Sequence, residues 1–270
     1  MVRCVTTGRS LGGRVVPGQD VLGGQVDFAR AAILLDVDGT LLDIAPTPDK
    51  IRVPVSLLGI LTQLRGRTGG ALALISGRPL AELDRIFAPL KLPAIGGHGA
   101  ELRLQDGSDG EARQADPLDE ALRQKLVNIA KVAPGIVIED KDYAIALHYR
   151  LAPDLERMLH KEVAAICARA APKDVQMLHG KAVIEVKSAR FNKGTAVREL
   201  MTHAPFKGRQ PVFVGDDITD EDVFAVLPEW NGLGLPVGRS MHEVEAALAS
   251  PSDVRAWLAR LLNGKGAPAP

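Results

Sequence analysis

An unbroken apolar run leads directly into two carboxylates within the segment 31–42, AAILLDVDGTLL. A short apolar run that stops at a Gly-Thr turn is typical of a buried strand in a parallel sheet. Residues two apart along a strand share a face, so Asp36 and Asp38 can point into one space. Close carboxylates repel each other unless a cation lies between them, and a hard divalent ion such as Mg²⁺ suits oxygen ligands. The segment alone is equally compatible with an Asp-Gly turn in which Asp38 has no chemical role.

The rest of the chain contains two kinds of pattern. In the first pattern, segments whose apolar residues have helical spacing alternate with short continuous apolar runs. This alternation predicts an α/β domain with a parallel sheet. Its expected strands are 31–35, 71–75, 94–97, 211–214 and 233–237, and its expected helices are 53–65, 80–87, 194–201, 221–227, 244–248 and 252–262. Between its halves, two amphipathic helices and about four short strands, mostly linked as hairpins, predict an α+β module with an antiparallel sheet.

These patterns predict an α/β fold with a Rossmann-like parallel-sheet core and an inserted α+β domain. The expected segments are a disordered N-terminal extension at 1–25, the core at 26–113 and 188–262, the inserted domain at 114–187, and a disordered tail at 263–270. A start with few acids and no apolar core is not a secretory signal.

Composition excludes several classes of partner. The 33 basic and 33 acidic residues balance, and only 4% of residues are aromatic, so we expect neither nucleic acid nor an anionic membrane surface as a partner. No apolar run reaches the length of a membrane span. Two cysteines without a pairing pattern suit a reducing, cytoplasmic location. The sequence does not determine the oligomeric state, and we adopt a monomer as the expectation.

Polar residues follow the predicted core strands or open the helix after them. They are Asp36, Asp38, Ser76, Lys193, Asp216 and Asp217. Because ligands of open α/β sheets bind outside the carboxyl ends of the strands, these groups can form one site.

Together these side chains suit phosphoryl transfer. A divalent ion on Asp36 and Asp216 and the ammonium of Lys193 would compensate the charge of a phosphate monoester. Ser76 could donate a hydrogen bond to a phosphoryl oxygen. Asp36 would be the nucleophile, and Asp38 would protonate the leaving oxygen and then activate water.

At these residues the chain resembles the haloacid dehalogenase-like phosphatases. The matching motifs are DVDGT at 36–40, Ser76, Lys193 and GDDITD at 215–220, in the order that the superfamily has them. The resemblance implies Mg²⁺ bound by Asp36, the backbone carbonyl of Asp38 and Asp216. It places Asp217 and Asp220 nearby, and leaves open which of them contacts the metal or its waters. It also implies that the inserted domain is a cap.

Motifs of the cap narrow the resemblance to the trehalose-6-phosphate phosphatase family. They are IEDK at 138–141, ALHYR at 146–150 and GKAVIEVK at 180–187, beside SGR at 76–78 and GHGAE at 97–101. The resemblance covers about 31–262. It implies Mg²⁺-dependent hydrolysis of trehalose 6-phosphate, a step of trehalose biosynthesis. It also implies that Glu139, Lys141 and Glu185 contact sugar hydroxyls, and that Arg78 and His98 line the core side.

Other interpretations remain open at this point. A capped phosphatase acting on another sugar phosphate would share every core motif, and only cap residues discriminate. A catalytically silent domain that binds sugar phosphates is a rival of another class. Taken singly, Ser76 suits a turn, Glu139 and Lys141 suit a solvated hairpin pair, and Asp220 suits the first turn of a helix.

Overall fold

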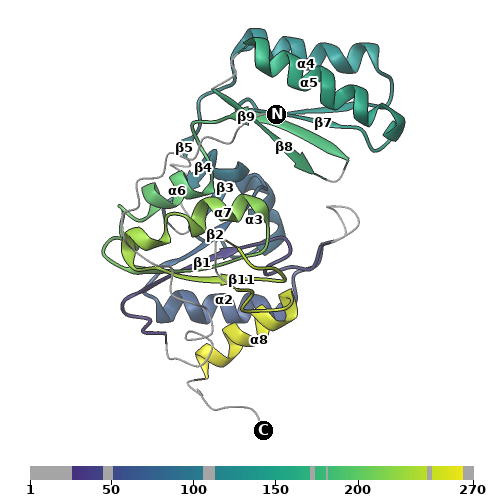
Figure 1. The fold of residues 1–270 in the computed structure, drawn as a ribbon. Coiled ribbons are helices and arrows are strands. Elements are labelled where there is room, and N and C mark those ends of the chain that lie inside the picture. The colour runs from purple at the N-terminus through teal and green to yellow at the C-terminus, as the bar shows by residue number, and fades with distance from the viewer. Residues whose placement is uncertain are drawn as a thin grey trace. The chain divides into compact units, whose positions relative to one another are not determined.

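The computed structural model of the chain describes residues 26–44, 51–105, 113–170, 174–180, 182–241 and 245–263. It divides into two compact units (Figure 1), one formed by Met1–Glu111 with Lys193–Pro270 and the other by Ala112–Asn192. The expected extension at 1–25 lies outside the described residues, as does the expected tail apart from Asn263. Among the described residues, no helix is both long and apolar enough to span a membrane.

Within the first unit, the strands of a mostly parallel sheet lie in the order β11-β10-β1-β2-β3-β4. All neighbours are parallel except β3 and β4, which are antiparallel. The strands are β1 (Ala31–Asp36), β2 (Leu72–Ile75), β3 (Ala94–Gly96), β4 (Glu101–Arg103), β10 (Gln210–Gly215) and β11 (Leu233–Pro236). Every residue of β1 is buried, as its unbroken apolar sequence predicts for a central strand.

Helices cover both faces of this sheet, which explains why β1 is apolar on both sides. Ile33 and Leu35 belong to a core that includes residues of α2, α3 and α8, whereas Ala32 and Leu34 belong to a second core with α6 and α7. The helices are α2 (Val55–Arg67), α3 (Leu80–Phe87), α6 (Lys193–Leu200), α7 (Glu221–Phe224) and α8 (Pro251–Leu262). The described residues of this unit also form the short 3₁₀ helices η2 (Gly97–Gly99), η4 (Ile218–Asp220) and η5 (Leu227–Trp230).

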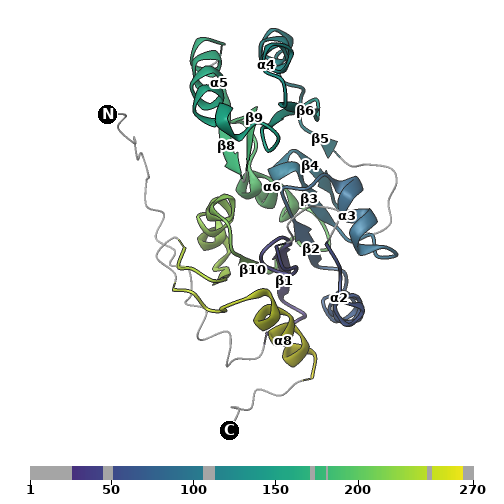
Figure 2. The same cartoon turned by 90° about the vertical axis from the view of Figure 1, so that its right-hand side faces the viewer.

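The second unit is a four-stranded antiparallel sheet, order β6-β7-β9-β8, with two helices on one face (Figure 2). Its elements are β5 (Arg113–Gln114), α4 (Glu120–Val132), β6 (Val137–Asp140), β7 (Ala144–His148), η3 (Pro153–Leu155), α5 (Glu156–Ala170), β8 (Val175–Gly180) and β9 (Val183–Ser188). Apolar residues of β7 and β9, such as Ile145 and Ile184, pack with α4 and α5 in a third core. Alternate residues, Glu185 among them, therefore lie on the other face of the sheet.

The predicted fold class is confirmed: an α/β core with a mostly parallel sheet is interrupted by an α+β unit. The prediction of a helix at 244–248 is wrong for the described residues 245–248. There the backbone N–H groups of Ala247 and Leu248 donate to Pro236, and Leu248 bridges Val237 in parallel. Pairing to the end of β11 satisfies this backbone in place of a helix. The helix expected at 221–227 ends at Phe224, and η5 follows with Pro228 in its first turn.

Candidate active site

The ammonium of Lys193 lies between two buried carboxylates where β1 ends and α6 begins. Its Nζ donates to Oδ1 of Asp36 at 2.8 Å and to Oδ1 of Asp220 at 2.6 Å. The three side chains are at most 5% exposed. Lys193 is the first residue of α6, as the sequence predicts. An ammonium is unfavourable at the positive end of a helix, and the two carboxylates hold it there.

Asp220 organises the loop that follows β10. Its Oδ2 accepts hydrogen bonds from the backbone N–H groups of Asp216 at 2.9 Å and Asp217 at 3.0 Å. A Cβ atom on Gly215 would lie 2.6 Å from the same oxygen, so this close approach requires glycine. Asp220 therefore fixes both the loop and Lys193, a role that its position at a helix start does not reveal.

The turn after β1 brings Asp216 beside Asp36. Gly39 has a φ of +84°, and a Cβ atom at this position would overlap the carboxylate of Asp216. Thr40 donates from its Oγ1 to Oδ1 of Asp216 at 2.8 Å. The Gly-Thr pair that follows Asp38 thus seats a carboxylate that comes from 176 residues further along the chain.

Three carboxylates converge in a way that fits a divalent cation. Asp36, Asp216 and Asp220 each offer an oxygen, and these oxygens lie within 4.8 Å of one another. Oδ2 of Asp36 is buried and accepts no hydrogen bond in the described part of the chain. Buried carboxylate oxygens without donors are poorly stable unless a cation compensates them, and oxygen donors suit hard divalent ions.

The other two predicted metal ligands are placed differently. Asp217 turns toward its own loop, where it accepts a hydrogen bond from Oγ1 of Thr219 at 3.0 Å. Burial opposes its charge, but hydrogen bonds from the backbone of Ile218 and from Thr219 lower the pKa of Asp217. The carboxylate of Asp38 is bound by Arg78, which leaves its backbone carbonyl as the group predicted to face a metal.

Electrostatics in this cluster favour binding of a further positive charge. Burial raises the pKa of Asp36, and the neighbouring Asp220 raises it further, against the opposing effect of Lys193. Burial also raises the pKa of Asp216. Burial opposes the charge on Lys193, but Asp220 and Asp36 outweigh it and raise the pKa of Lys193. Lys193 is therefore a permanent cation, and it does not by itself neutralise the three carboxylates.

Ser76 and His98 lie where β2 and β3 end. Ser76 is 1% exposed, and its Oγ accepts a hydrogen bond from the backbone N–H of Arg78 at 3.1 Å. The backbone N–H of His98 donates to the carbonyl of Ser76 at 3.1 Å. A Cβ atom on Gly77 would overlap the ring of His98, so the two loops are packed together. The five predicted residues Asp36, Asp38, Ser76, Arg78 and His98 therefore belong to adjacent strand ends.

The three predicted sugar-binding residues are brought together in the second unit. Nζ of Lys141 lies 3.2 Å from Glu185 and 3.8 Å from Glu139. The strand register explains this, since Glu139 pairs with Ala146 and Ala146 pairs with Glu185, so a small side chain separates the two carboxylates. His148, which the prediction did not include, lies 3.0 Å from Glu139 through its Nε2.

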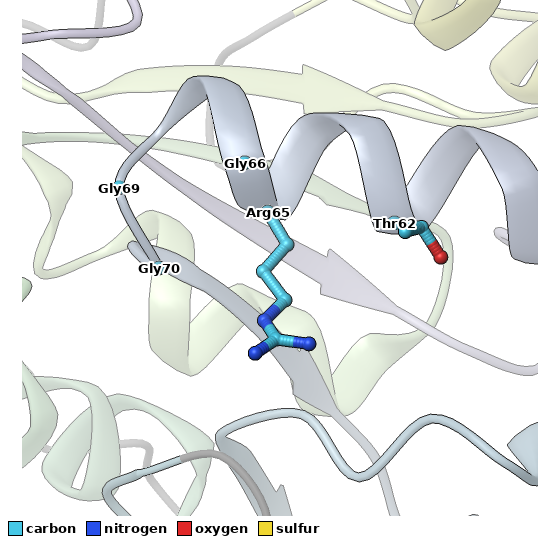
Figure 3. Close-up of a pocket in the computed structure, with 5 residues that line it drawn as sticks. All are labelled: Thr62, Arg65, Gly66, Gly69 and Gly70. Carbon is cyan, nitrogen blue, oxygen red and sulfur yellow. The ribbon is translucent and has the colours of Figure 1, made fainter.

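A separate hollow of about 410 Å³ lies where α2 ends and leads into β2 (Figure 3). It is lined by Thr62, Arg65, Gly66, Gly69 and Gly70. This is the amino end of β2, whereas Ser76 and Asp36 lie at the carboxyl ends of the strands. None of the predicted site residues lines it.

The site consists of a buried aspartate, a lysine and paired aspartates at the carboxyl ends of a mostly parallel sheet. This arrangement defines a haloacid dehalogenase-like phosphatase, as the motifs predict. The C-terminal domain of a Candida albicans trehalose-6-phosphate phosphatase has this fold, with a TM-score of 0.73 and 26% identity over 93% of this chain and 99% of that one.

Sequence comparison gives the family. The profile of the trehalose-phosphatase family matches residues 34–253, and the chain belongs to this family. A probable trehalose-phosphate phosphatase of Sinorhizobium fredii is 42% identical over 87% of this chain and 88% of its own length. The trehalose-6-phosphate phosphatase of Escherichia coli is 39% identical over 85% and 86%, respectively.

Proposed function

We propose that this protein is a Mg²⁺-dependent phosphatase that hydrolyses trehalose 6-phosphate to trehalose and inorganic phosphate. The observation that carries the proposal is the buried Asp36, held by Lys193 at 2.8 Å beside Asp216 and Asp220. The names of the curated relatives support the choice of substrate. The cluster of Glu139, Lys141 and Glu185 supports recognition of a polyhydroxylated leaving group, because it offers both acceptors and a donor.

In the first step, a carboxylate oxygen of Asp36 attacks the phosphorus atom of the substrate. A bond forms between this oxygen and phosphorus, and the bond between phosphorus and the sugar oxygen breaks. Asp38 gives its proton to the departing sugar oxygen, so trehalose leaves as a neutral alcohol and Asp38 becomes a carboxylate. Lys193 holds Asp36 in place and stabilises charge on the phosphoryl group.

In the second step, the aspartyl-phosphate is hydrolysed. The carboxylate of Asp38 takes a proton from a water molecule, whose oxygen attacks phosphorus. Inorganic phosphate leaves, Asp36 returns to its carboxylate form, and Asp38 is again protonated. Ser76 donates a hydrogen bond to a phosphoryl oxygen in both steps.

Asp36, the Asp38 carbonyl and Asp216 would hold Mg²⁺, with Asp217 supporting it, and Asp220 belongs to the same oxygen cluster. Bound there, the ion supplies positive charge that draws the phosphate monoester toward the carboxylates. The buried Oδ2 of Asp36, which accepts no hydrogen bond from the residues that the structure describes, supports this assignment. Arg78 and His98 are proposed to contact the substrate from the first unit. We also propose a cytoplasmic location, because the chain has two cysteines and Cys167 is a free, buried thiol.

The proposal is tested by phosphate release from trehalose 6-phosphate and from the 6-phosphates of glucose, sucrose and mannose, with Mg²⁺ and with chelator. We expect a kcat/KM for trehalose 6-phosphate at least about 100-fold above the others, and loss of activity with chelator. Glu139→Ala and Lys141→Ala should lower this preference while turnover of a small aryl phosphate persists. Val137→Ala, an exposed position on the same strand, is the control.

Two outcomes would replace the proposal. Metal-dependent activity that is highest with another sugar phosphate would agree with the aspartyl-phosphate mechanism. It would contradict the proposal that the second unit recognises trehalose. Binding of trehalose 6-phosphate without phosphate release would indicate a silent binding domain.

A further inference from the structure

The guanidinium of Arg78 lies between two carboxylates, and only one of them has a part in the proposed mechanism. Nε and Nη2 of Arg78 donate to the two oxygens of Asp38 at 2.6 and 2.9 Å. Nη1 donates to Oε1 of Glu82. The side chain of Arg78 is 14% exposed, so these contacts are partly shielded from solvent.

The two-pronged contact fixes the orientation of Asp38. A planar guanidinium that binds both oxygens of a carboxylate sets its plane as well as its position. Three of the five N–H donors of Arg78 are used, two toward Asp38 and one toward Glu82, whereas the resemblance implies only that Arg78 lines the core side of the substrate site. The placement of the acid/base Asp38 therefore depends on where Arg78 is held.

The position of Glu82 on its helix favours a carboxylate. It belongs to the first turn of α3, where the positive end of the helix favours a carboxylate. The start of this helix is fixed by Glu101, whose Oε2 accepts from the backbone N–H of Leu80 at 2.6 Å. The only other ion pair of Glu82 in the described residues is with Arg85, at 3.5 Å, and Arg85 is 64% exposed.

We propose that Glu82 is a positioning residue of the reaction, which acts through Arg78 to orient Asp38 for proton transfer to the leaving oxygen. The inference rests on the proposed function, because it assumes that Asp38 is the acid. Without Glu82, the guanidinium loses one of its two anchors. Asp38 then loses its fixed plane, while Asp36, Lys193 and the oxygen cluster are untouched.

The proposal predicts that the effect of replacing Glu82 depends on the leaving group of the substrate. A sugar alkoxide is a poor leaving group and needs the proton of Asp38, whereas p-nitrophenolate leaves without one. The parameter kcat/KM covers events up to release of the leaving group. A fault in proton delivery therefore lowers kcat/KM for an alkyl phosphate and leaves it nearly unchanged for p-nitrophenyl phosphate.

The experiment compares wild type with Glu82→Ala, Glu82→Gln and the control Arg85→Ala. The substrates are p-nitrophenyl phosphate and the sugar phosphate that wild type hydrolyses best. For Glu82→Ala we expect kcat/KM to fall by about tenfold or more with the sugar phosphate and by less than about threefold with the aryl phosphate. Glu82→Gln keeps an acceptor oxygen and should recover part of the loss. Arg85→Ala should stay within about twofold on both substrates.

Inhibition by trehalose separates positioning from sugar binding. We expect its inhibition constant to be unchanged in Glu82→Ala. An equal fall with both substrates would indicate a structural role and overturn the proposal, as would no fall with either. A tenfold rise in the inhibition constant would move Glu82 to sugar binding and also overturn it. If the wild type prefers another sugar phosphate, only the proposed substrate is contradicted. The effect of Glu82→Ala on kcat/KM can still be compared between that sugar phosphate and p-nitrophenyl phosphate. Wild type without any sugar phosphatase activity overturns both.

Discussion

Lys193 donates a 2.8 Å hydrogen bond to Asp36 across 157 residues of sequence, and both side chains are buried. The pair joins the end of the central strand β1 to the start of α6, which comes after the whole second unit. The carboxylate that we propose as the nucleophile is therefore held by a residue from the far half of the first unit. Removing either partner alters the charge of a buried site.

Lys193→Met should abolish activity and strongly destabilise the protein. The substitution leaves Asp36 and Asp220 buried with no ammonium between them. Breaking a buried ion pair from one side typically costs about 3–5 kcal/mol. Urea unfolding in chelator measures the loss, with the exposed Lys207→Met as control. A change below about 1 kcal/mol would contradict the buried arrangement.

Asp36→Asn should be inactive but more stable than wild type in chelator at pH 7. Because the pKa of folded Asp36 is raised, its contribution to stability is present at low pH and is lost as pH rises through that pKa. The variant escapes this loss, and asparagine still offers an acceptor to Lys193. We expect the midpoint of thermal unfolding to rise by roughly 2–4 °C at pH 7. The gain should shrink toward pH 5. A lower midpoint at pH 7 would show that the ion pair with Lys193 outweighs burial.

Gly39→Ala should remove metal-dependent activity while the protein still folds. The new methyl group would overlap the carboxylate of Asp216, and φ at this position is +84°. We expect kcat to fall by about 100-fold or more, because a displaced carboxylate no longer completes the oxygen cluster. Gly59→Ala on α2 is the matched control, since nothing lies within 4 Å of its added Cβ. It should gain about 0.5–1 kcal/mol of stability and keep full activity.

Mg²⁺ binding should weaken as pH falls. Burial raises the pKa values of Asp36 and Asp216, so protons compete with the ion for these carboxylates. Affinity should fall by up to about tenfold per pH unit for each proton released below the pKa. Calorimetry at pH 6, 7 and 8 in two buffers of different ionisation enthalpy measures affinity and proton release together. Asp216→Asn should release fewer protons. An affinity that is the same at all three pH values would contradict the raised pKa values.

The sequence predicts the fold well where one pattern decides the outcome. The apolar run before Asp36 is typical of a strand buried on both faces, and β1 has this position. The resemblance implies that Glu139 and Glu185 bind the same sugar. The sequence does not show how they are brought together, which is by pairing of both residues with Ala146 in neighbouring strands.

Some side-chain contacts of the site were beyond prediction. Asp220 suits the first turn of a helix, so its contact with Lys193 has no signal in the local sequence. Glu82 lies only four residues after Arg78, but a carboxylate in the first turn of a helix does not by itself reveal this contact. The region around Leu248 has helical spacing, but pairing with the end of β11 gives its backbone other partners. Tertiary contacts decide these cases.

Trapping the phosphorylated enzyme tests the central claim most directly. Enzyme is mixed with trehalose 6-phosphate and Mg²⁺, quenched in acid within milliseconds, digested and analysed by mass spectrometry. The account predicts one phosphoryl group on the peptide that contains Asp36. It should be absent from Asp36→Asn and accumulate in Asp38→Asn with p-nitrophenyl phosphate, because hydrolysis of the intermediate then lacks its base. Phosphate release without any phosphorylated peptide, or a phosphoryl group on another residue, would contradict the assignment of Asp36 as the nucleophile.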